Sequence, residues 1–181
     1  MTATVPVPGA TEPRVHRHDW FLEAKRERLF EPHVASINAY AQRLEVRTGK
    51  AIPAADPDSG GQFSGVLLLF ESPSRKGVQR GSGMISCDND DVSAKNVWEA
   101  HRDTGLRRQT CIAWNIVPWY VGTEESNEPP TEEDLHKGSE LLPSFIELLP
   151  DLKVVIPVGK AAAKGGLSNL AAQGCICQTC S

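Results

Sequence analysis

Three short apolar runs constrain the fold of this chain more than any other feature. They cover residues 66–70, 111–117 and 153–158, and none shows the polar alternation of a half-exposed strand. Continuous apolar strands are typical of a sheet that is covered on both faces. Helical stretches separate the runs, and such an order predicts a parallel sheet between helices. We therefore expect an α/β fold of three layers, α/β/α, around a short central parallel sheet of three to four strands.

Helical patterns fill most of the remaining chain. Apolar residues at 3–4 spacing predict two helices within residues 19–47, and cap and stop signals predict further helices within residues 91–105 and 131–149. Residues 161–172 are also helix-like. Residues 175–179 can form a fourth strand, so the predicted sheet extends almost to the last residue.

Composition limits the class of protein. The chain has 181 residues, 40% of them hydrophobic, which is too apolar for a disordered protein. No apolar run approaches the roughly 18 residues of a membrane span, and the start does not look like a secretory signal. We expect a flexible N-terminal arm at residues 1–18, a single domain at residues 19–181 and a cytoplasmic, monomeric protein. Trp20, Trp98 and Trp114 are expected in its core.

Charge argues against one further class. The formal net charge is −4, so the chain is not a basic protein that coats nucleic acid. A mildly acidic protein can still carry a small basic patch. Contact with nucleic acid, if any, is therefore expected to be local.

Polar residues stand where the first two predicted strands end. Glu71 follows the first run directly, and Asn115 is the only polar residue inside the second. Ligands bind beyond the carboxyl ends of parallel strands, so both residues are site candidates. Each also has a structural interpretation, since Glu71 could cap a helix or face solvent, and Asn115 could satisfy neighbouring backbone. Between them, the glycines of residues 81–91 would allow close approach to a ligand.

Three segments in this order resemble the motifs of the uracil-DNA glycosylase superfamily, nearest to its small bacterial branches with a Glu-containing first motif. Residues 70–74 (Phe-Glu-Ser-Pro-Ser) stand in the place of that first motif. Residues 83–86 (Gly-Met-Ile-Ser) stand in the place of a loop that bears Phe in the family. Residues 115–119 (Asn-Ile-Val-Pro-Trp) stand in the place of an Asn-led motif. The resemblance covers roughly residues 65–164 and rests on the combination of the three segments and their placement.

The resemblance implies a DNA base-excision repair enzyme that works without a cofactor. Such an enzyme flips uracil, or a related deaminated base, out of DNA and hydrolyses its N-glycosidic bond. Glu71 would be the catalytic residue, orienting a water and stabilising the oxocarbenium-like sugar. Asn115 would bind the base, because its amide offers a donor for O4 and an acceptor for N3–H. Met84 would cover the flipped base.

DNA contacts are expected beside the flipped nucleotide. Hydroxyl and backbone N–H groups would contact the flanking phosphates, and the residues that provide them are Ser72, Pro73, Ser74 and Ser86. Local positive charge would come from Arg75, Lys76 and Arg80. These three cations could equally belong to a solvated loop.

The last motif of the family is missing. It is of the His-Pro-Ser type, and its His stabilises the leaving uracil anion. No histidine follows the third predicted strand; the five histidines are His16, His18, His33, His101 and His136. Losing one such contact often costs about 10²–10³ in rate. We therefore expect a domain shortened at its C-terminal end, and a catalytically impaired relative that binds DNA or lesions without excision is the alternative.

Two groups of residues suggest metal binding as a further alternative. Cys175, Cys177 and Cys180 could be ligands for zinc or an iron–sulfur cluster, but three ligands at the end of a chain make an incomplete site. The aspartates within residues 88–91 could hold a divalent metal, or one could cap a helix while the others are solvated. We expect free thiols and no metal, with uracil-containing DNA as the partner and no membrane.

Overall fold

A parallel sheet of short strands forms the centre of the structure. The computed structural model describes residues 10–78, 81–123, 125–170 and 176–177. Within them the main sheet has the order β4-β2-β5-β6, and all three neighbouring pairs are parallel. Its strands are β2 (Val66–Phe70), β4 (Cys111–Asn115), β5 (Val154–Pro157) and β6 (Ile176–Cys177). An α/β fold with short parallel strands and flanking helices is thus confirmed.

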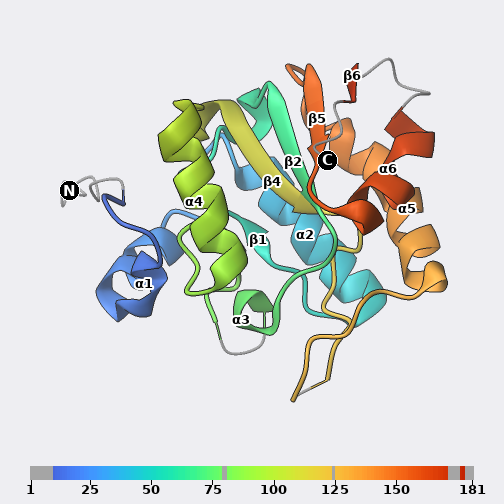
Figure 1. The fold of residues 1–181 in the computed structure, drawn as a ribbon, viewed down its shortest axis with the longest axis horizontal. Coiled ribbons are helices and arrows are strands. Elements are labelled where there is room, and N and C mark those ends of the chain that lie inside the picture. Colours follow the sequence, from blue (N-terminus) through green and yellow to red (C-terminus); the bar gives the residue numbers. More distant parts are fainter. Residues whose placement is uncertain (1–9, 79–80, 124, 171–175, 178–181) are drawn as a thin grey trace.

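Helices lie on both sides of this sheet (Figure 1). They are α1 (Asp19–Arg26), α2 (Ala35–Thr48), α3 (Arg75–Val78), α4 (Val92–Thr104), α5 (Glu132–Ile146) and α6 (Lys160–Leu170). Three 3₁₀ turns are η1 (Val15–Arg17), η2 (Gly61–Phe63) and η3 (Arg108–Thr110). None of the helices in the described ranges is long and apolar enough to cross a membrane.

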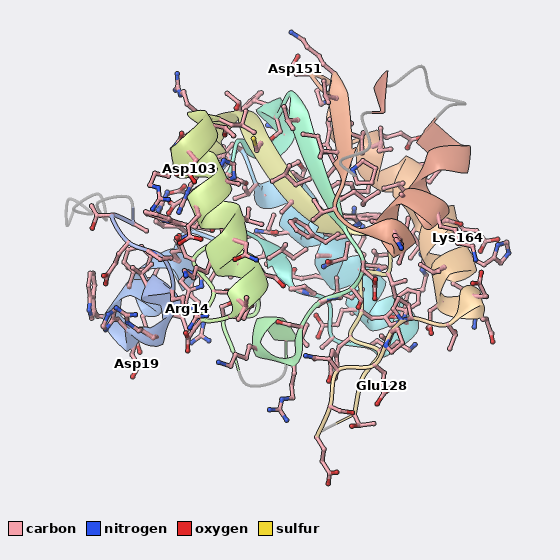
Figure 2. All side chains as sticks on the ribbon, in the orientation of Figure 1. Arg14, Asp19, Asp103, Glu128, Asp151 and Lys164 are labelled. Carbon is pink, nitrogen blue, oxygen red and sulfur yellow. The ribbon has the colours of Figure 1, made fainter. Side chains whose placement is uncertain are left out.

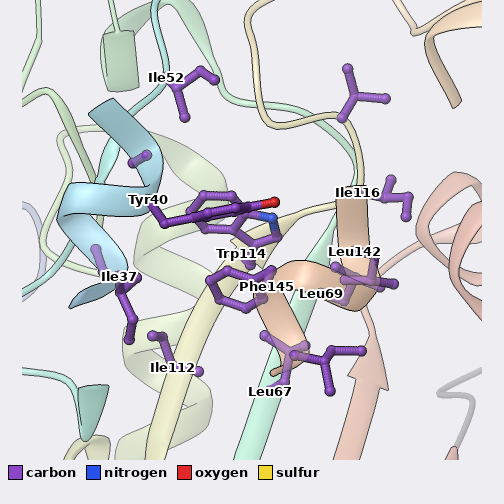
Figure 3. Close-up of a cluster of buried hydrophobic side chains, with 14 of the residues drawn as sticks. Ile37, Tyr40, Ile52, Leu67, Leu69, Ile112, Trp114, Ile116, Leu142 and Phe145 are labelled. Atoms are coloured by element: carbon purple, nitrogen blue, oxygen red, sulfur yellow. The ribbon is translucent and has the colours of Figure 1, made fainter. Parts of the chain in front are cut away.

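One face of the sheet carries the core. Alternate strand residues point to this face and pack against α2 and α5 (Figure 3). The rings of Trp114 and Phe145 are stacked with centroids 4.2 Å apart, and the Tyr40 hydroxyl donates to the Leu141 carbonyl at 3.0 Å. The other strand residues of this cluster are Leu67, Leu69, Ile112 and Val155. This packing fixes α2 and α5 to the sheet.

The opposite face is only partly covered. Leu68, Phe70 and Ile156 point to it because side chains alternate along a strand, and all three are half-buried. Helix α4 lies over this face (Figure 1), and a cavity lies between it and strands β2 and β5. The two faces of the sheet therefore differ, although the apolar runs predict equal cover.

A second, smaller sheet lies beside the first. It consists of β1 (Ala54–Ala55) and β3 (Met84–Ile85), which are parallel with Ala54 opposite Met84. The Ala54 N–H donates to the Gly83 carbonyl at 2.8 Å. This pairing brings the predicted base-covering loop next to the segment after α2.

Most helix boundaries agree with those predicted from the sequence. Asp91 caps α4 by accepting from the Ala94 N–H at 2.8 Å, and Gly105 ends that helix with a positive φ of 70°. Thr131 and Asp134 form a capping box at the start of α5. These signals are local, which is why they could be predicted.

Several expectations from the sequence differ from the structure. Trp98 was expected in the core, but it is only half-buried on α4. The second strand ends at Asn115, two residues earlier than predicted. The prediction that Trp20 lies in the core is wrong, since its side chain is 65% exposed. Helix α1 stands outside the layers around the sheet (Figure 1), and it buries Phe21, Leu22 and Lys25 instead.

Residues 1–9 of the predicted N-terminal arm lie outside the described residues. In the rest of that arm, Val15 and His16 are buried. The His16 N–H donates to the Asp88 carbonyl at 3.0 Å. This part of the chain therefore packs against the segment that follows β3.

The close packing of α5 on the end of β4 gives a stability prediction. A Cβ atom at Gly138 would lie 2.0 Å from the Ile116 carbonyl oxygen, so Gly138→Ala must push α5 away from the strand. Overpacking of this kind costs about 1–3 kcal/mol. We expect chemical denaturation to show that loss for Gly138→Ala, whereas the exposed substitution Glu140→Ala on the same helix should leave stability nearly unchanged. Equal stability of Gly138→Ala and wild type would contradict the packing.

Candidate functional site

Strands β2 and β4 end side by side, which brings the two main site candidates together. Phe70 and Asn115 are partners in the ladder. The pairing continues past the strands, where the Ile116 N–H donates to the Phe70 carbonyl at 2.8 Å and the Val117 N–H donates to the Glu71 carbonyl at 3.0 Å. Glu71 and Asn115 therefore lie at the same edge of the sheet, as predicted.

A cavity of about 680 Å³ opens beside these strand ends. It lies between α4 and the partly covered face of the sheet, and its volume is in the range of small-molecule sites, roughly 300–1,000 Å³. Its apolar lining includes Leu68, Phe70, Val97, Ile156 and Val158. The predicted site residues that line it are Glu71, Ser72, Pro73, Ser74, Met84, Ser86 and Asn115. The structure thus brings the three motif segments around one cavity.

The Asn115 side chain has an unusual environment. Asn115 is only 3% exposed, and its Nδ2 atom is buried with no hydrogen-bond partner among the described residues. Buried polar atoms in proteins are nearly always paired, and leaving a donor unpaired costs about 1–3 kcal/mol. The Nδ2 atom therefore does not satisfy neighbouring backbone. Because Asn115 is also one of the residues that line the cavity, this donor is a candidate contact for a ligand there.

Glu71 begins the turn that connects β2 to α3. Its side chain is half-buried and lines the cavity. Pro73, two residues later, is buried. The Ser74 hydroxyl accepts from the Gly77 N–H at 3.2 Å, which starts α3 directly after the turn. The carboxylate is thus carried by a short, fixed connection rather than by a long loop.

Met84 forms part of the cavity wall and is fully buried. Its backbone is held on both sides. The Ser82 hydroxyl accepts from the Met84 N–H at 3.0 Å and donates to the Met84 carbonyl at 3.1 Å. Asn89 Nδ2 also donates to that carbonyl, at 2.9 Å. The backbone of Met84 is therefore fixed in the cavity wall, while its side chain has no exposed surface there.

The Ser86 hydroxyl already has partners. It donates to the Asp56 carboxylate and accepts from the Asp88 N–H at 3.0 Å. A phosphate contact from this hydroxyl, as the resemblance implies, would have to compete with Asp56. Ser86 thus links the cavity wall to a buried acidic group that the sequence did not suggest.

The predicted phosphate-binding cations lie on and after α3. Arg75 and Lys76 are exposed on this helix. Lys76 Nζ donates to the Asp90 carbonyl at 2.8 Å and lies 3.5 Å from its carboxylate. Arg80 lies outside the described residues. The loop around Glu128 extends away from the sheet (Figure 2), and Asn127 Oδ1 in this loop accepts from the Arg75 N–H at 3.3 Å.

Sequence reasoning missed a buried ion cluster next to the cavity. Lys25 is 0% exposed, and its Nζ atom lies 2.8 Å from Asp56, 2.6 Å from Asp88 and 3.1 Å from Asp58. Arg108 donates to both carboxylate oxygens of Asp88 at 2.8 and 2.9 Å. The only signal in the sequence is the place of Lys25 on the apolar side of its helix, four residues after Phe21.

Electrostatics keep Lys25 and Asp56 ionised. Burial lowers the pKa of Lys25, but the three carboxylates more than offset it, so the pKa is raised. Burial also raises the pKa of Asp56, yet Lys25 and the Ser86 hydroxyl lower it to about 2. Charged partners that are removed from water stabilise each other only when all are present. The cluster is therefore sensitive to the loss of any one member.

The metal alternatives gain no support from the described residues. Asp88 is paired with Lys25 and Arg108, Asp90 with Lys76, and Asp91 caps α4. In the part of the chain with assigned structure, no group of three or more His, Cys, Asp or Glu residues could hold a metal ion. Of the three tail cysteines, Cys175 and Cys180 lie outside this part, and Cys177 is described only as a residue of β6.

Histidine is scarce around the cavity. Among the described lining residues, only His101 is a histidine. Its Nδ1 donates to the Leu106 carbonyl at 2.7 Å. It lies ten residues after the Asp91 cap of α4, about 15 Å along the helix axis. His101 is thus at the end of the cavity away from the strand ends.

Comparison with known proteins adds no assignment. No protein-family model matches this chain, and no curated protein matches it.

Proposed function

We propose that the cavity binds uracil, or a related deaminated base, flipped out of DNA, and that the protein hydrolyses the N-glycosidic bond of that base. The observation that carries the proposal is the buried, unpaired Nδ2 donor of Asn115 in the same cavity as Glu71. The proposal includes a uracil-DNA-glycosylase-like, three-layer fold. The parallel order β4-β2-β5-β6 with helices on both faces is compatible with it.

Asn115 would select the base. Uracil presents an acceptor at O4 next to a donor at N3–H, and a side-chain amide matches both with Nδ2–H and Oδ1. Cytosine presents the reverse pattern and would leave both amide groups unpaired. Because a buried unpaired group costs about 1–3 kcal/mol, this mismatch supports strong discrimination. Met84 and Phe70 would provide apolar contact for the ring.

Glu71 would act on the glycosidic bond. A water molecule adds to C1′ of the sugar while the C1′–N1 bond breaks, and the bonding electron pair leaves with the base. The carboxylate stabilises the positive charge that develops on the sugar and accepts a proton from the water. Negative charge on the departing uracil spreads to O4, where the hydrogen bond from Asn115 Nδ2 would strengthen.

Contacts with DNA would be few. The turn of residues 72–74 at the rim of the cavity can offer hydroxyl and backbone N–H groups to phosphates. Arg75, Lys76 and Arg80 would add positive charge, so binding is expected to weaken with salt. A small number of cations is consistent with the acidic net charge of the whole chain.

A base-release assay tests the proposal. Labelled single- and double-stranded oligonucleotides with one uracil, or one hypoxanthine, are incubated with wild type and with Glu71→Gln. We expect wild type to release uracil and Glu71→Gln to be slower by about 10²–10³. The matched control is Glu140→Gln, which replaces an exposed carboxylate on α5 and should leave the rate unchanged. The same rate in wild type and Glu71→Gln would contradict the proposal.

A second candidate is a protein that binds uracil DNA without excising the base. The observation that favours it is the position of His101, since no described histidine stands at the strand ends where the leaving base would be. This candidate predicts salt-sensitive binding without release. The same oligonucleotides separate the two functions when binding and release are measured together.

A further inference from the structure

The wall of the cavity that carries Met84 is a short segment with little support of its own. We call residues Met84–Asn89 the wall loop; five of its six residues line the cavity. Its regular structure is limited to the two residues of β3, paired with the two residues of β1. Such a short pair of strands is marginally stable in isolation. Other contacts must therefore hold the wall loop in place.

The buried ion cluster provides those contacts. Lys25 Nζ bonds at once to Asp56, which follows β1, and to Asp88 in the wall loop, at 2.8 and 2.6 Å. Ser86 of the wall loop donates to Asp56. A single ammonium group from α1 thus joins the two segments that follow the strands of the small sheet. Either carboxylate would lose its contact with this buried ammonium group if its segment moved away.

Two further groups converge on the same loop. Arg108, just before β4, holds the other side of Asp88. His16 bonds to Asn89 Oδ1 at 2.8 Å through Nδ1, while Asn89 Nδ2 donates to the Met84 carbonyl. The wall loop is therefore attached to the first helix, the N-terminal segment and the main sheet. Among the residues that the structure describes, Lys25 alone contacts both the carboxylate that follows β1 and the carboxylate that follows β3.

We propose that Lys25 is a positioning residue that holds the wall loop closed against the cavity. It acts through Asp56 and Asp88 and does not line the cavity itself. Without the ammonium group, the buried carboxylates repel each other and draw water, and the wall loop moves outward. The effect on base binding rests on the proposed function, but the effect on the loop does not.

Cys87 reports directly on this loop. It lies between Ser86 and Asp88, and burial together with the Asp88 carboxylate raises its pKa to about 12. A thiol with such a pKa reacts slowly at neutral pH, because little thiolate is present. Cys87 is half-buried in the folded protein. Outward movement of the wall loop exposes it further and lowers its pKa, so it becomes more reactive. Cys111 in β4 is buried in the main sheet and reports on global opening instead.

The experiment measures thiol labelling in full-length protein with one cysteine. In one background Cys87 is the only thiol, with Cys111→Ala and the tail cysteines changed to Ser; in the other, Cys111 is the only thiol. Lys25→Met should raise the labelling rate of Cys87 by about tenfold or more, with a smaller change at Cys111, because the opening is local. Lys137→Met, which removes an exposed lysine on α5, should change neither rate.

A charge-balanced variant separates positioning from folding. Lys25→Met combined with Asp56→Asn removes one charge of each sign and leaves the Arg108–Asp88 pair intact, so it should remain folded even if Lys25→Met does not. This variant still lacks the ammonium group that joins the segments after β1 and β3, so Cys87 should again label rapidly. Its affinity for uracil DNA should fall by a larger factor than its rate of uracil release at saturating DNA. Protection of Cys87 equal to wild type in this folded variant would overturn the proposal. If wild type has no activity on DNA but Lys25→Met selectively exposes Cys87, the proposed function is contradicted and the positioning role of Lys25 is not.

Discussion

Replacing Lys25 by methionine is expected to lower the free energy of unfolding by about 3–5 kcal/mol. Methionine has a similar length and keeps the apolar stem in place, so the loss is electrostatic. Asp56 and Asp88 would be left buried around an uncharged group. Because domains are stable by only about 5–15 kcal/mol, this single change removes a large share of the total.

Chemical denaturation of wild type and Lys25→Met measures this loss. Lys137→Met is the matched control, since Lys137 forms an exposed i,i+4 pair with Glu133 and such pairs contribute little to stability. A loss for Lys25→Met no larger than that of the control would show that the cluster does not stabilise the fold.

Replacing Asn115 by leucine is expected to separate stability from function. Leucine has nearly the same shape but no unpaired donor, so the protein should become more stable by about 1 kcal/mol. Uracil release should fall by about 10²–10³, because the base loses both hydrogen bonds of its recognition edge and one of them stabilises the leaving group. A gain in stability with a loss of function is typical of a binding-site residue.

Asn38 provides the matched comparison. It is also buried, but its amide is fully used: Nδ2 donates to the Leu29 carbonyl at 2.6 Å, and Oδ1 accepts from the Ala55 N–H at 2.7 Å. Asn38→Leu should therefore destabilise the protein, by about 1–3 kcal/mol. Denaturation curves of the two variants should move in opposite directions. A loss of stability in Asn115→Leu as large as in Asn38→Leu would point to a structural role for Asn115.

The sequence was sufficient for features whose signals are local. The apolar runs located β2, β4 and β5, and the residues Asp91, Gly105 and Thr131 located helix ends, because a cap or a strand depends on a few neighbouring residues. Glu71 and Asn115 could be placed together because parallel strands end at the same edge. The other predicted site residues that line the cavity belong to the same motif segments, at residues 70–74, 83–86 and 115–119.

Contacts between distant residues could not be predicted in the same way. Lys25 contacts carboxylates that lie 31 and 63 positions later in the chain. The residues next to Lys25 and next to these carboxylates carry no pattern that predicts the contact. Trp20 was expected in the core, yet α1 buries the side that carries Lys25. The unpaired state of Asn115 Nδ2 also depends on every atom around it. These three features can be seen only in the three-dimensional structure.

The central claim is that the Asn115 amide recognises the edge of uracil in DNA. Binding of an oligonucleotide with an uncleavable 2′-fluoro-2′-deoxyuridine tests it most directly, because the test does not depend on catalysis. Wild type should bind this oligonucleotide more tightly than its 2′-fluoro-2′-deoxycytidine counterpart, by about 1–3 kcal/mol, and Asn115→Leu should bind the two equally. Equal affinity of wild type for the uracil and cytosine oligonucleotides would contradict the account.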